Sequence, residues 1–276
     1  MATGTGRLSA AEIFDRVTTG GEEELERPFF NLAFSGVAAG LSMGISALGV
    51  ALVLAQLGTG DGAEALAYLL YPLGFITVIL GRQQLFTENT LFPVALVLEE
   101  RRHLRALGKL WGTVLLANVV GTCLFAALAI LTSAVSPEAQ AELAQLGVEA
   151  ADHGVTTIFW TGVIGGWLIA MVAWLVTAST TTTGQLTVIF LLTYAVGVGH
   201  FAHSIAGSAE LLSAVLAGDL TVLDYLRWLA AAVLGNAVGG VVIVALLAYG
   251  QVRGAPESLD AKPEETSTPL EDQHRE

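Results

Sequence analysis

Charged residues and cysteine are both scarce in this chain of 276 residues. Charged side chains make up 13% of the sequence, hydrophobic residues make up 54%, and the mean hydropathy is +0.67. This composition is typical of a protein that lies in a membrane, and the 31 glycines fit helices that pack closely in lipid. Cys123 is the only cysteine, which excludes an internal disulfide.

The sequence also lacks the residue clusters on which an enzyme would depend. No group of metal-ligating residues and no nucleophile–base pair is apparent, so we expect no catalytic residues, no metal and no cofactor. The first 28 residues are polar and acidic, unlike a cleavable signal peptide. We expect membrane lipid, and not nucleic acid, as the surroundings of this protein.

Long apolar stretches are what the sequence has in abundance. Each is as long as, or longer than, the roughly 20 residues that a helix needs to cross the hydrocarbon core. They predict an all-α membrane protein with six transmembrane helices. The stretches cover about 29–57, 67–98, 107–135, 156–178, 185–217 and 221–250.

The basic residues predict how these helices are oriented. If there are six spans, ten of the 12 basic residues fall on one side of the membrane, and only Arg227 is on the other, because Arg82 lies within a span. By the positive-inside rule, both termini are then cytoplasmic. We therefore expect an integral protein of a prokaryotic cell (inner) membrane. The ten are Arg7, Arg16, Arg27, Arg101, Arg102, Arg105, Lys109, Arg253, Lys262 and Arg275.

Two of the apolar stretches are interrupted by polar residues. Tyr68–Leu98 breaks at residues 85–90, and Leu186–Leu216 breaks at residues 200–204. Both are longer than one unbroken helix needs, so a half-helix, a loop and a second half-helix fit better. Non-helical backbone at this depth must be buried in protein or line a wet cavity. Matched breaks of this kind indicate a transport site near the bilayer midplane.

The two halves of the chain keep a common register. Each break is followed by a similar segment, LLANVVG at 115–121 and VLGNAVG at 233–239. Asn118 and Asn236 are 118 positions apart, and Thr87 and His203 are 116 apart. Because three spans precede the second half, it enters from the opposite side, and the repeat, about 29–135 and 156–250, is inverted.

The sequence outside the spans divides the chain into three parts. Residues 1–28 form a cytoplasmic N-terminal segment with an amphipathic helix expected around Ala10–Val17. Residues 29–250 form the six-span channel or transporter domain. The acidic residues 251–276 are expected to be a disordered cytoplasmic tail.

The second break places His203 and Ser204 at membrane depth. An ionisable residue there is a functional hypothesis by default, and histidine exchanges protons near neutral pH. The alternative is a buried histidine satisfied by backbone carbonyls. Thr87 brings a hydroxyl from the first break. We therefore predict that His203, Ser204 and Thr87 line a pore.

Apolar and charged residues flank this predicted centre. Leu85, Phe86 and Phe201 could form constrictions, although ordinary packing is the alternative. The half-helices that begin near Thr90 and Ser204 point their positive ends at the centre, which favours an anion. We expect Arg82 to pair with Glu88 or Glu210. Supporting roles, chiefly hydrogen bonds to broken backbone, are expected for Asn89, Asn118 and Asn236.

At these residues the chain resembles the formate/nitrite transporter family. The resemblance lies in GRQQLFTENT at 81–90 and FAHSIAG at 201–207, and it extends over roughly residues 25–250. The family implies an aquaporin-like fold, a homopentamer and one pore in each protomer. It also implies passage of small monovalent anions such as formate, nitrite, hydrosulfide or lactate, often with a proton. The family's central histidine corresponds to His203 and its loop threonine to Thr87.

The chain departs from the family pattern at three positions. Gln84 and Glu88 replace the glutamate and glycine of the common ELFTGN form, and Gly166 falls where some members have asparagine. The chain is therefore similar to a divergent branch of the family.

The leading prediction is a channel or transporter, passive or proton-linked, for small monovalent weak-acid anions or their neutral acids. A neutral-solute pore of aquaporin type is the first alternative, although no Asn-Pro-Ala occurs at either break. A non-transporting membrane scaffold is the second.

Overall fold

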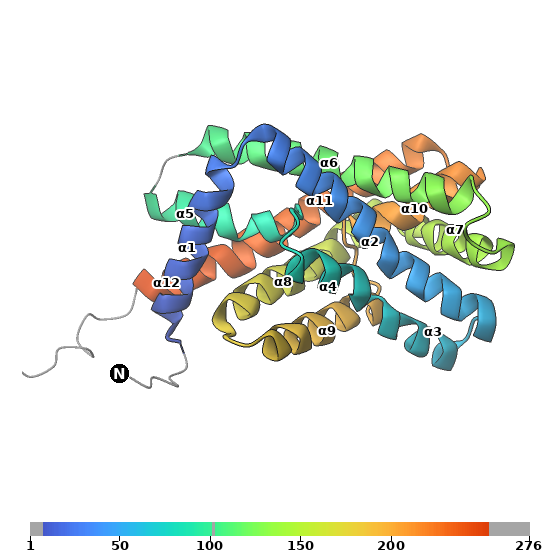
Figure 1. Ribbon diagram of the computed structural model, residues 1–276, viewed down its shortest axis with the longest axis horizontal. Helices are drawn as coiled ribbons and strands as arrows, with labels where there is room; N and C mark the ends of the chain where they lie inside the picture. The colour runs from blue at the N-terminus through green and yellow to red at the C-terminus, as the bar shows by residue number, and fades with distance from the viewer. Residues whose placement is uncertain (1–7, 101–102, 254–276) are drawn as a thin grey trace, which may run out of the picture.

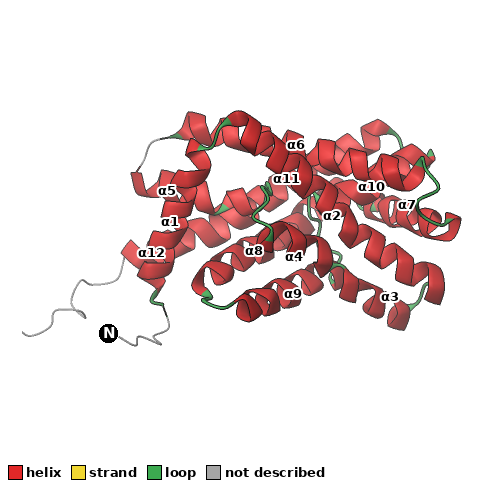
Figure 2. Cartoon of the chain, in the orientation of Figure 1, coloured by secondary structure: helices red, strands yellow, loops and turns green. Residues whose placement is uncertain are grey.

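The structure is a computed structural model that describes residues 8–100 and 103–253. Within these ranges every regular element is a helix, and short loops join the helices (Figures 1 and 2). The tail expected at 251–276 lies, from residue 254 on, outside the described residues. The all-α fold predicted from the apolar stretches is confirmed.

The helices follow one another with few long connections. Two short 3₁₀ turns (η1 and η2) and one π-helical segment (η3) occur among them. In order they are α1 (Ala10–Glu26), α2 (Phe29–Leu57), α3 (Asp61–Ala67), η1 (Tyr68–Leu70), α4 (Pro72–Leu80), η2 (Glu88–Thr90), α5 (Phe92–Glu100), α6 (Leu104–Ile130), α7 (Pro137–Asp152), α8 (Val155–Ala178), α9 (Thr182–Val198), α10 (Ala206–Ala217), α11 (Val222–Val238), η3 (Gly239–Ala245) and α12 (Leu246–Arg253).

Five helical stretches in the described ranges are long and apolar enough to cross a membrane. The stretch predicted as the fifth span is instead divided into the shorter apolar helices α9 and α10. The six-span count therefore stays a prediction, in which α9 and α10 together make one span. The five are Phe29–Leu57, Gly62–Leu80, Leu104–Ile130, Val155–Ala178 and Val222–Val252.

Two helices lie outside the apolar spans. α1 is longer than the predicted Ala10–Val17, and a reciprocal capping box of Ser9 and Glu12 begins it. It packs against α5 and α12 at one end of the molecule (Figure 1). α7 occupies most of the connection between the third and fourth apolar stretches. The Ser136 hydroxyl caps α7, and Pro137 begins it.

Glycines bring the first two long helices of each half into close contact. A Cβ on Gly40 of α2 would lie 2.0 Å from the backbone oxygen of Asn118 on α6. A Cβ on Gly166 of α8 would lie 2.2 Å from the backbone oxygen of Asn236 on α11. Since only glycine permits so close an approach, these contacts fix the distance of each helix pair. They place the two asparagines at equivalent points of the halves.

Candidate functional site

The first break is held open by the side chain of Asn118. Its Oδ1 accepts a hydrogen bond from the backbone N–H of Phe86 at 2.9 Å. Its Nδ2 donates to the backbone oxygens of Gln84 and Gly36, each at 2.8 Å. The amide thus satisfies backbone groups that have no helical partner and ties them to α2.

The second break repeats this arrangement around Asn236. Its Oδ1 accepts from the backbone N–H of Ser204 at 2.8 Å, and its Nδ2 donates to the oxygens of Ala202 and Gly162, each at 2.8 Å. The pattern relates residue 86 to residue 204, a shift of 118. His203 is therefore the structural counterpart of Leu85, and the expected equivalence of Thr87 and His203 is wrong by two positions.

The same shift of 118 relates Arg82 to His200. Both residues adopt the left-handed backbone conformation, with φ of 54° and 48°. Each follows a glycine that closes a helix, Gly81 after α4 and Gly199 after α9. Non-glycine residues seldom take this conformation. The chain therefore turns out of both helices in the same way, with a basic or titratable side chain at the turn.

The two breaks meet at Thr87 and His203. Thr87 Oγ1 lies 2.8 Å from His203 Nε2, within hydrogen-bond distance, and both side chains are buried. Thr87 comes from the turn before η2, and His203 from the turn before α10. The structure thus brings together the two residues that the sequence placed at the predicted pore centre, although they are not symmetry mates.

The backbone decides which ring nitrogen of His203 carries a proton. The N–H of Ala206, 3.0 Å away, can only donate, so Nδ1 of His203 accepts. In the neutral ring the proton is then on Nε2, which donates to Thr87 Oγ1. A second proton on Nδ1 would face the Ala206 N–H and would require this contact to open. The resting geometry therefore favours a neutral histidine that acts as a hydrogen-bond donor.

Aromatic rings enclose this hydrogen-bonded pair. The ring of Phe75 meets that of His203 edge-on, with centroids 5.0 Å apart. Phe86 makes a similar contact with Trp111 at 5.7 Å, and the Trp111 indole N–H donates to the backbone oxygen of Asn89 at 2.9 Å. Asn89 also donates from Nδ2 to the Gln84 side chain at 3.1 Å. These contacts fix the first break.

Two cavities approach the pair from opposite sides. The α1-side cavity, about 620 Å³, has Leu85 and Glu88 in its wall together with residues of α1. The α7-side cavity, about 440 Å³, has Phe201 and His203 in its wall together with residues of α7. No described residue lines both. Leu85 and Phe201 therefore border different cavities, and Phe86, Thr87 and Ser204 line neither.

The expected ion pair of Arg82 is not formed. Its side chain is exposed and lines the α1-side cavity, and no ion pair of Arg82 occurs among the described residues. Glu88 lines the same cavity without a salt bridge there to Arg82, whereas Glu210 lines the α7-side cavity and cannot reach it. The prediction failed because Arg82 turns outward with its left-handed backbone.

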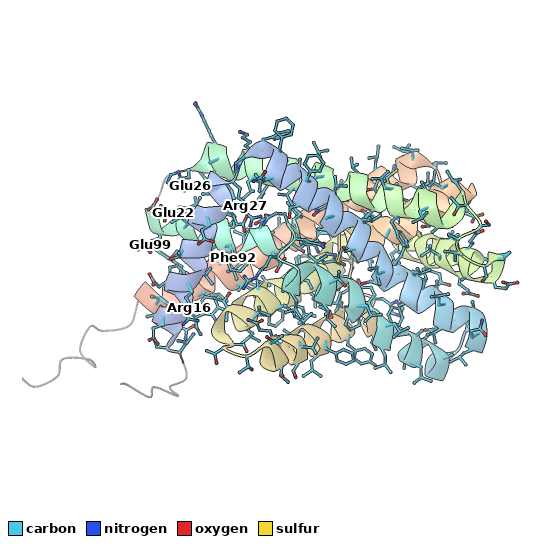
Figure 3. The ribbon with its side chains drawn as sticks, in the orientation of Figure 1. Arg16, Glu22, Glu26, Arg27, Phe92 and Glu99 are labelled. Atoms are coloured by element: carbon cyan, nitrogen blue, oxygen red, sulfur yellow. The ribbon has the colours of Figure 1, made fainter. Side chains whose placement is uncertain are left out.

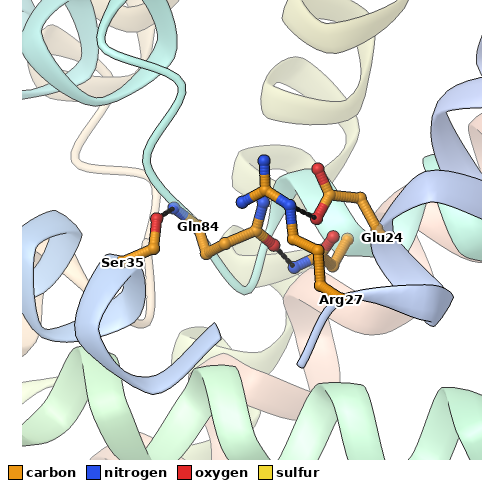
Figure 4. Close-up of polar contacts among 5 residues, drawn as sticks. Glu24, Arg27, Ser35 and Gln84 are labelled. Carbon is orange, nitrogen blue, oxygen red and sulfur yellow. Dashed lines mark hydrogen bonds and ion pairs between the residues drawn. The ribbon is translucent and has the colours of Figure 1, made fainter. Parts of the chain in front are cut away.

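A different arginine is paired at the α1-side cavity. Arg27 Nε lies 3.3 Å from Glu24 Oε2 (Figure 4). Burial raises the pKa of Glu24, and the charge of Arg27 opposes this rise. Nearby, the Ser35 hydroxyl accepts from the Gln84 backbone N–H at 3.0 Å (Figure 4). Figure 3 shows more charged side chains of α1 at this end, among them Arg16, Glu22 and Glu26.

Comparison with known proteins assigns the chain to a family. The formate/nitrite transporter family matches residues 11–250. The inner membrane protein YfdC of Escherichia coli is 35% identical over 247 residues, which cover 88% of this chain and 79% of that protein. A probable formate transporter of Methanothermobacter thermautotrophicus is 26% identical, over 70% of this chain and 77% of that one.

Two solved structures share the fold. An ion channel of the FNT family has a TM-score of 0.78 at 18% identity and covers 88% of this chain and 99% of its own. A pentameric formate channel with formate bound has a TM-score of 0.69 at 19% identity and covers 86% and 98%. The matched breaks and the sequence match over residues 11–250 lead to one conclusion: this chain belongs to the formate/nitrite transporter family.

Proposed function

We propose that this protein is a membrane channel or transporter for small monovalent weak-acid anions of the formate and nitrite type, or their neutral acids. The observation that carries the proposal is the 2.8 Å contact of Thr87 with His203, made by two broken helices between two opposed cavities. A probable formate transporter among the relatives and a formate channel with the same fold support the substrate class.

We call the contact of Thr87 with His203 the junction. Its hydrogen bonds all run in one direction and leave the Thr87 hydroxyl free to donate to a solute. The Ala206 N–H donates to His203, and His203 donates to Thr87 Oγ1. The Thr87 hydroxyl then retains its own hydrogen, for which no acceptor occurs among the described residues. A solute oxygen that reaches Thr87 therefore meets a donor, which suits a carboxylate, a nitrite or the carbonyl oxygen of a neutral acid.

A second hydroxyl at the junction is unused. Ser204 Oγ is buried without a hydrogen-bond partner among the described residues. An unpaired buried hydroxyl is costly, and a solute oxygen or a water would satisfy it. Ser204 adjoins His203 in the chain, and we infer that its hydroxyl is available to the same solute.

The residues around the junction disfavour a bare charge. Leu85, Phe86 and Phe201 are apolar, and moving an ion past such side chains at membrane depth is expensive. A weak acid avoids this cost when a proton accompanies the anion. We therefore infer proton-linked passage, with constrictions at these three residues.

The outer surface of the helices fits a protein embedded in lipid and assembled from several copies. Large apolar side chains are exposed along the long helices, and a related fold is that of a pentameric channel. We infer a homopentamer with lipid on its perimeter, and cytoplasmic termini in an inner membrane, as the basic residues predict. Examples are Phe30, Phe34, Leu116, Leu124, Leu128, Leu234 and Leu247.

Uptake into proteoliposomes tests the proposal. Formate, nitrite and the neutral solute glycerol are compared at about pH 5 and about pH 8, the range in which histidine changes charge. We expect formate and nitrite to enter faster than into protein-free liposomes and glycerol to enter at the protein-free rate. Rapid glycerol influx without formate influx would establish a neutral-solute pore, and no influx of any solute would favour a scaffold.

A further inference from the structure

A row of aromatic rings runs along the α7-side cavity to His203. The rings of His200 and Tyr68 are 5.2 Å apart, and those of Tyr68 and Tyr71 are 6.0 Å apart. Tyr71 is followed by Phe75 at 5.5 Å, and Phe75 by His203 at 5.0 Å. The row therefore connects the exposed His200 with the buried junction.

Tyr71 has a hydroxyl that no other residue uses. Tyr68 Oη lies 3.3 Å from His200 Nδ1, but Tyr71 Oη has no hydrogen-bond partner among the described residues. The Tyr71 side chain is only 5% exposed and lines the cavity. The Tyr71 hydroxyl is not completely buried, so a solute in the cavity can reach it.

The backbone around Tyr71 is fixed, which gives the hydroxyl a definite position. The Ser46 hydroxyl of α2 donates to the Tyr71 backbone oxygen at 2.5 Å and accepts from the Gly74 N–H at 3.1 Å. The Tyr71 ring packs on Phe75 on one side and approaches Gly197 of α9 on the other. A buried hydroxyl held in place and left unpaired is a ready binding group for a solute.

The carboxyl groups around this hydroxyl have no described lysine or arginine among them. Four carboxylates line the α7-side cavity and no lysine or arginine does, whereas three arginines and three glutamates line the α1-side cavity. A cleft lined by one sign of charge lowers the local concentration of ions of that sign. The carboxylates are Glu64 of α3, Glu149 and Asp152 of α7, and Glu210 of α10. The other titratable groups there are Tyr68, His153, His200 and His203.

We propose that the Tyr71 hydroxyl binds a small neutral acid in the α7-side cavity and that the four carboxylates exclude the anion from this site. The inference rests on the proposed function and names the chemical form of the solute on this side. The hydroxyl donates to the carbonyl oxygen of the acid, and the aromatic row leads the bound acid toward Phe75 and His203. An anion gains no opposite charge there and meets repulsion instead.

The experiment follows formate into proteoliposomes with a pH dye inside and with valinomycin and potassium to collapse any membrane potential. Neutral formic acid brings a proton, so it acidifies the lumen, and valinomycin does not accelerate it. The formate anion moves charge, so valinomycin accelerates it. For the unaltered protein we expect acidification that is independent of valinomycin.

Two sets of variants test the two parts of the proposal. Tyr71→Phe keeps the ring and removes the hydroxyl. Because one hydrogen bond to the solute is lost, the half-saturation concentration of formic acid should rise about three- to tenfold. The matched control is Tyr194→Phe, because Tyr194 of α9 does not line the cavity. Glu149→Gln with Glu210→Gln should add a valinomycin-accelerated flux at about pH 8 in low salt. Glu138→Gln, on α7 but away from the cavity, should not.

The outcomes separate this inference from the proposed function. If formate crosses in neither form, the proposed function fails. If the unaltered protein passes formate as a valinomycin-accelerated anion, and Tyr71→Phe and the charge variants leave the flux unchanged, only the inference is overturned. If Tyr71→Phe does not assemble, the charge variants decide, because an unchanged anion flux in them overturns the exclusion of the anion.

Discussion

Asn118 and Asn236 hold the two helix breaks by the same three hydrogen bonds. Each accepts from one backbone N–H of its break and donates to one carbonyl of that break and to one carbonyl of the helix that its own helix packs on. Both side chains are fully buried. The non-helical backbone next to Thr87 and His203 is therefore kept in shape by one amide in each half.

Replacing either asparagine by leucine should destabilise the protein. Asn118→Leu or Asn236→Leu leaves one buried N–H and one carbonyl of the break unpaired, which costs about 1–3 kcal/mol for each group. We expect a clearly lower midpoint of thermal unfolding in detergent for both variants. Asn31→Leu, at an exposed position of α2, is the control and should unfold as the unaltered protein does. Normal midpoints in both core variants would contradict the supporting role.

The close helix contacts give a second stability test. Gly40→Ala and Gly166→Ala force a methyl group into a backbone oxygen, and such overpacking costs about 1–3 kcal/mol or more. Gly112→Ala on α6 meets open space and serves as the control. We expect lower yields of assembled protein, measured by size-exclusion chromatography, for the first two variants only. Equal yields for all three would show that the helices separate at little cost.

Arg82 is expected to act on the solute and not on folding. Because Arg82 is exposed in the α1-side cavity, Arg82→Asn should assemble normally, and asparagine tolerates the left-handed backbone. We expect slower formate uptake at about pH 8 in low salt and a smaller effect in high salt. Arg105→Asn is the control, since exposed Arg105 does not line this cavity. A loss of assembly instead would restore a structural role for Arg82.

The orientation in the membrane is tested by cysteine labelling. In a Cys123→Ser background, Glu22→Cys on α1 and Glu138→Cys on α7 introduce thiols at two exposed positions. An impermeant maleimide added to intact cells should label the residue-138 thiol alone, because α1 belongs to the cytoplasmic side in the predicted topology. Labelling of both thiols from outside would contradict it.

The breaks and their partners could be predicted because polar residues interrupt apolar stretches that are otherwise continuous. Thr87, His203 and the two asparagines are visible in this way. The register that relates the two halves could not be predicted, because the spacing of Thr87 and His203 nearly equals that of the two asparagines. Only the hydrogen bonds of the asparagines distinguish a shift of 118 residues from one of 116.

Other features depend on tertiary structure that no local pattern reveals. Arg82 turns outward because it has a left-handed backbone conformation directly after Gly81. An arginine that turned inward would have needed a carboxylate as its partner. The free hydroxyl of Tyr71 is recognisable only once Tyr68 is seen to approach His200 instead. α7 lies in a segment between two spans, and Ser136 and Pro137 are typical residues of a helix start.

The most direct test of the account is the pH profile of formate uptake in Thr87 and His203 variants, from about pH 5 to about pH 8. Thr87→Val keeps the shape but removes the donor, so we expect uptake to fall about tenfold or more, whereas Thr87→Ser retains most of it. His203→Asn keeps one hydrogen bond and should assemble but alter the pH profile. An unchanged rate and an unchanged profile in both Thr87→Val and His203→Asn would contradict a solute path through this junction.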